Sequence, residues 1–204
     1  PSAVVNSQIA SIVDANTLSA ALATLGTAYA SGMAVALNTT IKTGILDLGA
    51  EKVVISSAAA ITLTPRFLVI LGAVEASAGA ATRQAIESLF NDWNVAYNST
   101  LESLNVNEPR TVFYNIYTGL KNYTSSPTAY GFDPNSTTVT ACPYAGISAS
   151  GPYYDLSTCT EALAAANVGS NYSNYIFSDG FHPTTAVYKL VAQDMINLIN
   201  EKGW

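Results

Sequence analysis

The sequence predicts an α/β fold with a parallel sheet and helices on both of its faces. Long stretches with apolar residues three or four positions apart favour helices, and they alternate with two short β-branched runs that favour buried strands. The chain has 204 residues, with no internal repeat and no low-complexity linker. We therefore expect one domain over residues 1–204, with active-site chemistry at the carboxyl ends of its strands.

The first half of the chain is predicted to hold a helix, a strand and a second helix. Apolar residues recur at helical spacing from about 17 to 48, which indicates one long helix, or two in sequence, ending before Gly49. The run over 52–56, Lys-Val-Val-Ile-Ser, is too short for a helix and apolar on both faces, as in a buried parallel strand. Pro65 closes the loop that follows, and the second helix is expected from about 78 to 104.

The second half begins with another strand and ends with a helix. The run over 111–116, Thr-Val-Phe-Tyr-Asn-Ile, is rich in β-branched and aromatic residues and is predicted to be the second strand. Residues 119–178 are predicted to be mostly loop. Apolar residues on one face of 185–201 predict the last helix.

The composition excludes several classes of protein. Hydrophobic residues make up 49% of the chain and charged residues only 11%, less than half the roughly 25% of an ordinary soluble protein, which excludes a disordered chain. The net charge is −6 and no basic cluster occurs, so we expect no nucleic acid partner. The longest uninterrupted apolar run, Phe67–Val74, is much shorter than the ~20 residues of a membrane-spanning helix, so we expect no transmembrane segment.

The two cysteines, Cys142 and Cys159, flank a segment rich in Pro, Gly, Ser, Thr and Tyr. An even number of cysteines around a polar loop predicts one disulfide, and therefore a secreted or periplasmic protein. A zinc site needs several Cys or His ligands, whereas this chain has one histidine and no Cys-x-x-Cys, so we expect no cofactor. The sequence starts at Pro1 without the features of a signal peptide, which we expect to have been removed or to lie upstream.

The segment Phe177–Thr185, Phe-Ser-Asp-Gly-Phe-His-Pro-Thr-Thr, contains the histidine and opens the last predicted helix. An aspartate three residues before a histidine can turn its carboxylate onto Nδ1 and leave Nε2 facing outward as a base. Such a pair forms the base and the orienting residue of a catalytic triad. Asp179 and His182 are therefore the candidate catalytic residues.

This segment resembles the C-terminal Asp-x-x-His-Pro-Thr block of the GDSL (SGNH) serine esterases and lipases. Leu48–Ser56, Leu-Gly-Ala-Glu-Lys-Val-Val-Ile-Ser, followed by the Leu-Thr-Pro of 63–65, is similar to a strand and loop of that family. Residues 90–104 resemble the helix before the family's next strand. The paired cysteines also recur in lipase-like and acyltransferase-like members. The resemblance covers most of residues 44–204.

The resemblance implies a flavodoxin-like three-layer α/β/α sandwich with a parallel sheet, the SGNH hydrolase fold. It also implies hydrolysis of a small-molecule or lipid ester through an acyl-enzyme, with His182 as base and acid and Asp179 as its orienting residue. The family's Gly-Asp-Ser nucleophile block and its Gly-x-Asn-Asp block have no counterpart here, and the sequence has no Gly-x-Ser-x-Gly elbow. We therefore expect this chain to be the C-terminal part of such a domain, in a processed heterodimer with an N-terminal chain of the same precursor that carries the Ser and the oxyanion residues.

Two other functions remain open. The chain could be a non-catalytic binding or structural subunit that keeps the fold, or part of an acyltransferase, which would use the same residues and exclude water. If the nucleophile lay in this chain, Ser56 and Ser57 at the end of the first predicted strand would be the first candidates. Hydrogen bonding to the backbone is the favoured role for these serines, because the following Ala58–Ala60 provides no glycine for a tight turn.

Overall fold

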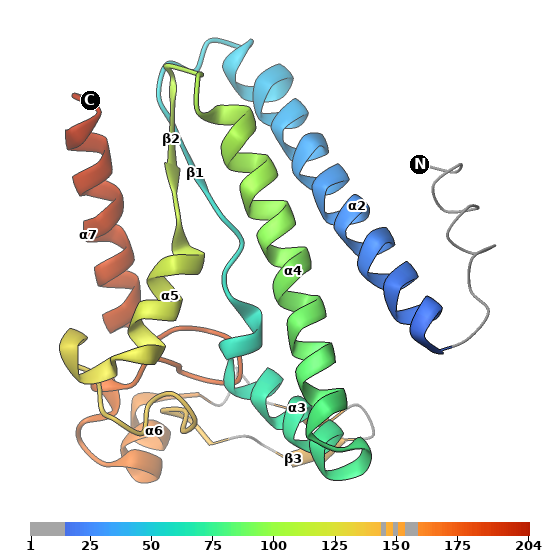
Figure 1. The fold of residues 1–204 in the computed structure, drawn as a ribbon. Coiled ribbons are helices and arrows are strands. Elements are labelled where there is room, and N and C mark those ends of the chain that lie inside the picture. The colour runs from blue at the N-terminus through green and yellow to red at the C-terminus, as the bar shows by residue number, and fades with distance from the viewer. Residues whose placement is uncertain (1–14, 144–145, 149–150, 154–158) are drawn as a thin grey trace. The chain divides into compact units, whose positions relative to one another are not determined.

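The structure is a computed structural model that describes residues 15–143, 146–148, 151–153 and 159–204 (Figure 1). The described residues form two compact units. The first unit contains residues 15–58 and 88–114, and the second contains 59–87 and the described residues from 115 to 204.

The first unit contains two helices and two strands in the predicted order. The predicted elements of this region are all present, with ends that differ by a few residues. The elements are helix α2 (Ala15–Ile41) with a π-helical turn after it (Lys42–Leu46), strand β1 (Val53–Ser56), the larger part of helix α4 (Ala80–Asn105) and strand β2 (Thr111–Tyr114).

Strands β1 and β2 pair in parallel, in a register that runs from Val53 opposite Thr111 to Ser56 opposite Tyr114. These two strands make up the whole parallel sheet in the described part of the chain. The observed fold is therefore α/β with a small parallel sheet, whereas the predicted three-layer sandwich requires a larger one. Strand β2 is shorter than predicted, because the Asn115 side chain accepts the Thr118 N–H at 3.0 Å and starts a helix there.

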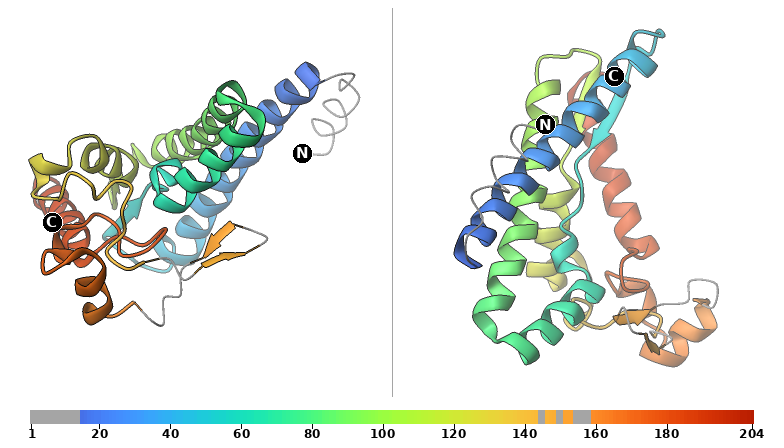
Figure 2. Two further views of the ribbon diagram at one scale, coloured as in Figure 1. Left: turned by 90° about the horizontal axis from the view of Figure 1, so that it is seen from below. Right: turned by 90° about the vertical axis from the view of Figure 1, so that its right-hand side faces the viewer.

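Helices α2 and α4 lie side by side, as Figures 1 and 2 show, and pack on the sheet through one apolar cluster. The contact between the helices is made by small residues of α2. Gly26 lies against the indole of Trp93, and the Thr100 hydroxyl donates to Ser31 at 3.2 Å. The buried members of the cluster are Ala34, Ile41, Leu46, Ile55 and Leu101.

Arg110 ties the start of β2 to the end of the turn after α2. Its guanidinium hydrogen-bonds both carboxylate oxygens of Glu108, at 2.9 and 3.0 Å, and donates to the Leu46 carbonyl at 2.9 Å. The hydrogen bonds from Arg110 hold the pKa of Glu108 at about 2, well below its usual value. Glu108 therefore stays ionised, and its bond to Arg110 persists, until the pH falls to about that value.

In its described residues, the second unit contains four α-helices, three short 3-10 helices (Ile61–Leu63, Pro127–Tyr130 and Tyr172–Asn174) and two paired antiparallel strands, besides the start of α4. The sequence predicts no helix just after Pro65, which is wrong, and it predicts mostly loop over 119–178, where the described residues are loop-rich but also contain two helices that were not expected. The elements are α3 (Pro65–Ala78), α5 (Ile116–Ser125), the antiparallel strands β3 (Gly146–Ser148) and β4 (Gly151–Tyr153), α6 (Glu161–Val168) and α7 (Thr185–Glu201).

Local capping explains two of the helices that the apolar pattern misses. Thr64 is extended and Pro65 occupies the first turn of α3, where a missing N–H costs nothing. The Thr160 hydroxyl accepts the Leu163 N–H at 3.2 Å and caps α6. Helix α7 has the bounds that the sequence predicts.

Helix α2 has an exposed apolar stripe, which we call the α2 stripe. It consists of four large apolar residues that share one face of the helix, because successive members are separated by four or seven positions. Their exposed fractions range from 42 to 72%. By length and composition alone, the helical segment Thr17–Leu46 is also long and apolar enough to cross a membrane, although threonines, serines and glycines interrupt its apolar residues. The members of the α2 stripe are Leu18, Leu22, Tyr29 and Met33.

Two glycines of α2 are expected to respond in opposite ways to substitution by alanine. A Cβ at position 26 would overlap the Trp93 ring, so Gly26→Ala should lower the free energy of unfolding by about 1 to 3 kcal/mol. A Cβ at position 32 would meet no neighbouring group within 4 Å. Gly32→Ala should therefore raise the free energy of unfolding by up to about 1 kcal/mol, because alanine favours the helix more than glycine does. Thermal and denaturant unfolding of both variants measures these changes, and equal changes would contradict the packing of α2 on α4.

Candidate active site

The predicted catalytic segment forms a tight turn before α7. Phe177 pairs with Pro183 in an antiparallel bridge, and the Ser178 N–H donates to the His182 carbonyl at 2.8 Å. The Ser178 hydroxyl also donates to the Pro183 carbonyl at 3.1 Å. We call residues 178–183 the catalytic turn. Its two arms are paired, so its tip projects Asp179 and His182 from a fixed base.

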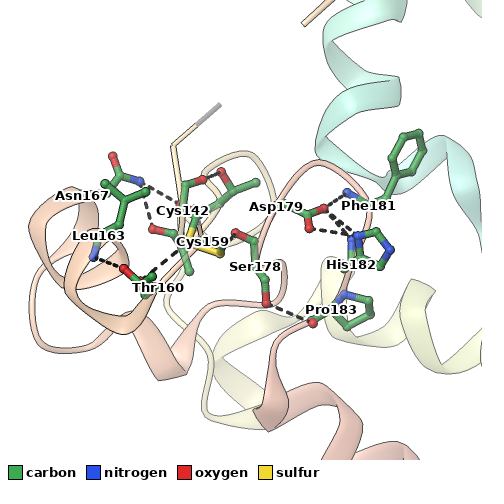
Figure 3. The surroundings of a disulfide bond; sticks show 12 residues. Cys142, Cys159, Thr160, Leu163, Asn167, Ser178, Asp179, Phe181, His182 and Pro183 are labelled. Carbon is green, nitrogen blue, oxygen red and sulfur yellow. Dashed lines mark hydrogen bonds and ion pairs between the residues drawn. A yellow bond between two sulfur atoms is a disulfide. The ribbon is translucent and has the colours of Figure 1, made fainter. Parts of the chain in front are cut away.

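The structure brings Asp179 and His182 together. The Asp179 carboxylate lies 2.9 Å (Oδ2) and 3.1 Å (Oδ1) from Nδ1 of His182 (Figure 3). Oδ1 also accepts the backbone N–H groups of Phe181, at 2.7 Å, and of His182, at 2.9 Å. Because an ionised carboxylate only accepts hydrogen bonds, the proton of a neutral His182 ring is placed on Nδ1 and leaves Nε2 free to act as a base.

The two side chains of this pair differ sharply in exposure. The Asp179 side chain is 5% exposed, whereas the His182 side chain is 56% exposed. A buried carboxylate is stable only when hydrogen bonds replace its water, and the three N–H groups around Asp179 do so. The arrangement combines a fixed, buried acceptor with an imidazole that a substrate can reach, as general base catalysis requires.

The predicted disulfide is present between Cys142 and Cys159, whose Cα atoms are 5.6 Å apart. It lies beside the catalytic turn (Figure 3), where the Cys142 N–H donates to the Ser178 carbonyl at 2.8 Å. The preceding Ala141 N–H donates to the Phe177 carbonyl, also at 2.8 Å. The disulfide therefore fixes a segment that is hydrogen-bonded to the residues just before Asp179. A disulfide is compatible with an oxidising compartment.

The start of α3 contacts the tip of the catalytic turn. The Arg66 N–H donates to the Gly180 carbonyl at 3.1 Å, and the Arg66 guanidinium carbon lies 5.4 Å from the centroid of the Phe181 ring. The sequence analysis missed this contact because it did not predict α3. The Thr64-Pro65 pair before an apolar run was the signal that could have revealed the helix.

Ser56 and Ser57 lie in the first unit, whereas the catalytic turn belongs to the second. The Ser56 side chain is exposed and its hydroxyl donates to the Ser57 carbonyl at 3.1 Å. Ser57 is buried, and its N–H donates to the Tyr114 carbonyl at 2.9 Å. The Ser56 hydroxyl therefore bonds to the backbone, as expected for a serine at the end of a strand.

The described residues show no metal-binding cluster and one cavity near the catalytic turn. No group of three His, Cys, Asp or Glu side chains gathers there as a metal site would need. A cavity of about 390 Å³ lies beside the disulfide, and Cys142, Cys159 and Lys189 are among its lining residues. Neither Asp179 nor His182 lines this cavity, so we do not assign it to a substrate.

Removing the disulfide is expected to loosen the catalytic turn. Replacing Cys142 and Cys159 together by serine should lower the free energy of unfolding by about 3 kcal/mol and speed exchange of the Phe181 and His182 amide hydrogens. Denaturant unfolding and hydrogen exchange measure both effects. The reduced wild-type protein should match the double variant, and the double variant should not respond to reductant. Unchanged exchange in the double variant would show that the disulfide does not support the turn.

The chain has a curated relative but matches no protein-family model. A GDSL esterase/lipase of Arabidopsis thaliana is 27% identical to it over 157 residues. The match covers 74% of this chain and 40% of the relative, so the chain spans about two fifths of the length of that relative. This distant similarity supports a relation to the GDSL esterases and lipases.

Proposed function

We propose that this chain supplies the His-Asp half of the active site of a GDSL (SGNH) type carboxylic ester hydrolase. The observation that supports this function most directly is the buried Asp179 carboxylate on Nδ1 of the exposed His182 imidazole. The pair lies within a segment that resembles the family's C-terminal block. The relative named a GDSL esterase/lipase supports the same reaction class.

In the proposed reaction, His182 Nε2 takes the proton of a serine hydroxyl as the serine oxygen attacks the ester carbonyl. Asp179 holds the ring in position through Nδ1 and stabilises the imidazolium that forms. His182 then gives the proton to the leaving alcohol, and an acyl-enzyme remains. In the second half of the cycle His182 deprotonates a water molecule, whose oxygen attacks the acyl group, and returns the proton to the serine.

The serine and the oxyanion donors come, in this proposal, from an N-terminal chain of the same precursor. The sequence has neither the Gly-Asp-Ser nor the Gly-x-Asn-Asp block of the family. About three fifths of the Arabidopsis relative has no counterpart in this chain, and a segment of that length could contain the missing blocks. The partner would also add strands to the sheet, because a sheet of two strands is marginal by itself and an all-parallel sheet needs both faces covered. The complete sheet would then be the three-layer sandwich of the SGNH fold.

The α2 stripe is the surface we assign to that partner. Four large apolar side chains exposed along one helix face form the kind of surface that an obligate interface covers. The opposite face of the same helix serves as a control, since it holds Val35, which is as exposed as Met33 at 48%. The disulfide and the low content of charged residues, 11% of the chain, fit a secreted or periplasmic complex.

Loss of His182 should remove most of the activity of the assembled enzyme. His182→Ala should lower turnover by about 10³-fold or more without unfolding the chain, and Asp179→Asn should lower it less, because an imidazole remains. Steady-state ester hydrolysis measures these effects.

Asp133→Asn is the matched control. Like Asp179, the Asp133 carboxylate accepts a nearby backbone N–H, that of Asn135 at 2.8 Å, but it contacts no histidine. Its turnover should equal that of the wild type. Full activity of His182→Ala would rule out the proposed function and leave the non-catalytic subunit as the better account.

A charge on the α2 stripe should disrupt the complex. Met33→Lys should weaken binding of the N-terminal chain at least tenfold, because it buries a charge in an apolar interface, whereas Val35→Lys should leave binding unchanged. Sedimentation and titration of the two separated chains measure the affinity. Equal affinities for both variants would contradict the assignment of the stripe, as would recovery of the 204-residue chain on lipid vesicles in place of a complex.

A further inference from the structure

Arg66 is a charged residue beside the catalytic turn that the proposed reaction does not use. It is the second residue of α3, and its backbone N–H and its guanidinium both reach the turn. The N–H donates to the Gly180 carbonyl, and the guanidinium lies over the ring of Phe181. Phe181 directly precedes His182, so both contacts fall within two residues of the imidazole.

The three arginines of the chain differ in what they bind. Arg83 forms ion pairs with Glu75 and Glu87, and Arg110 forms one with Glu108. No described carboxylate lies within ion-pair distance of Arg66. The described partner of this guanidinium is therefore the face of the Phe181 ring, in a cation–π contact.

The contacts of Arg66 complement those of Asp179. The first backbone N–H groups of a helix have no acceptor within the helix. In α3 one of them, the Arg66 N–H, donates to the Gly180 carbonyl. Asp179 holds the Phe181 and His182 amides from the inner side of the turn. The Phe181 ring is 42% exposed, so burial alone does not fix it.

We propose that Arg66 is a positioning residue for His182. It holds the tip of the catalytic turn by clamping Phe181 against the start of α3, and this role rests on the proposed catalytic function of His182. Because Arg66 acts through Phe181 and contacts no reacting atom, its loss should reduce the fraction of molecules with an aligned imidazole. Turnover should then fall while KM stays the same.

Substitutions at both partners test the clamp in the assembled enzyme. Arg66→Ala and Phe181→Leu should each lower kcat about three- to fivefold, as expected for the loss of an exposed cation–π contact. Arg66→Lys keeps the cation and Phe181→Tyr keeps the ring, so both should retain most of the wild-type rate. The double variant with Arg66→Ala and Phe181→Leu should be no slower than either single variant.

A second readout is independent of catalysis. His182 is the only histidine, so a histidine-labelled sample gives one set of imidazole signals in an NMR spectrum. In Arg66→Ala, the Nδ1–H proton of His182 and the Phe181 and His182 amides should exchange with solvent at least threefold faster than in the wild type. These signals report on the turn even if the complex hydrolyses no ester, so a failure of the clamp can be told from a failure of the proposed function.

Lys121→Ala is the matched control, because it removes another cation–π contact. Lys121 lies 5.4 Å from the centroid of the Tyr117 ring, the same distance as in the Arg66 contact, and Lys121 and Tyr117 both belong to α5. It should change neither kcat nor the exchange rates of the turn. The proposal is overturned if Arg66→Ala leaves the exchange rates unchanged, or if Lys121→Ala changes them by the same factor.

Discussion

The geometry of the catalytic turn depends on one buried carboxylate. Asp179 is 3% exposed and accepts three N–H groups, two from the backbone of the turn and one from the His182 ring. Burial makes each of these bonds costly to lose, because the carboxylate has no water to replace them. The same side chain therefore closes the turn and orients the imidazole, so the shape of the loop and the direction of its base cannot change separately.

Two segments that are distant in the sequence, and one hydrogen bond between the residues that flank it, hold this turn. The disulfide-linked segment at 141–142 pairs with 177–178, the start of α3 binds the Gly180 carbonyl, and the Thr184 hydroxyl donates to the Tyr175 carbonyl at 2.6 Å just before α7. A base must stay within hydrogen-bond reach of its target, and such supporting contacts restrict its motion. The supports explain why an exposed imidazole can still have a defined position.

Sequence reasoning was most successful where a pattern is long or local. The periodic helices α2, α4 and α7 were predicted nearly at their observed bounds, and the three-residue spacing of Asp179 and His182 was enough to predict their contact. Helices α3, α5 and α6 were missed because they are short or lie in segments rich in turn residues, where only the local start signals Pro65, Asn115 and Thr160 mark them. The Arg66 contact could not be predicted, since it joins residues more than a hundred positions apart.

In the proposed reaction, His182 and Asp179 activate a serine that lies outside these 204 residues. A fluorophosphonate probe attaches to an activated serine, and tandem mass spectrometry of the digested native complex locates the modified residue. Our account predicts that the label lies on a peptide absent from this sequence and that His182→Ala abolishes labelling. A label on Ser56, Ser57 or any other serine of this chain would contradict it.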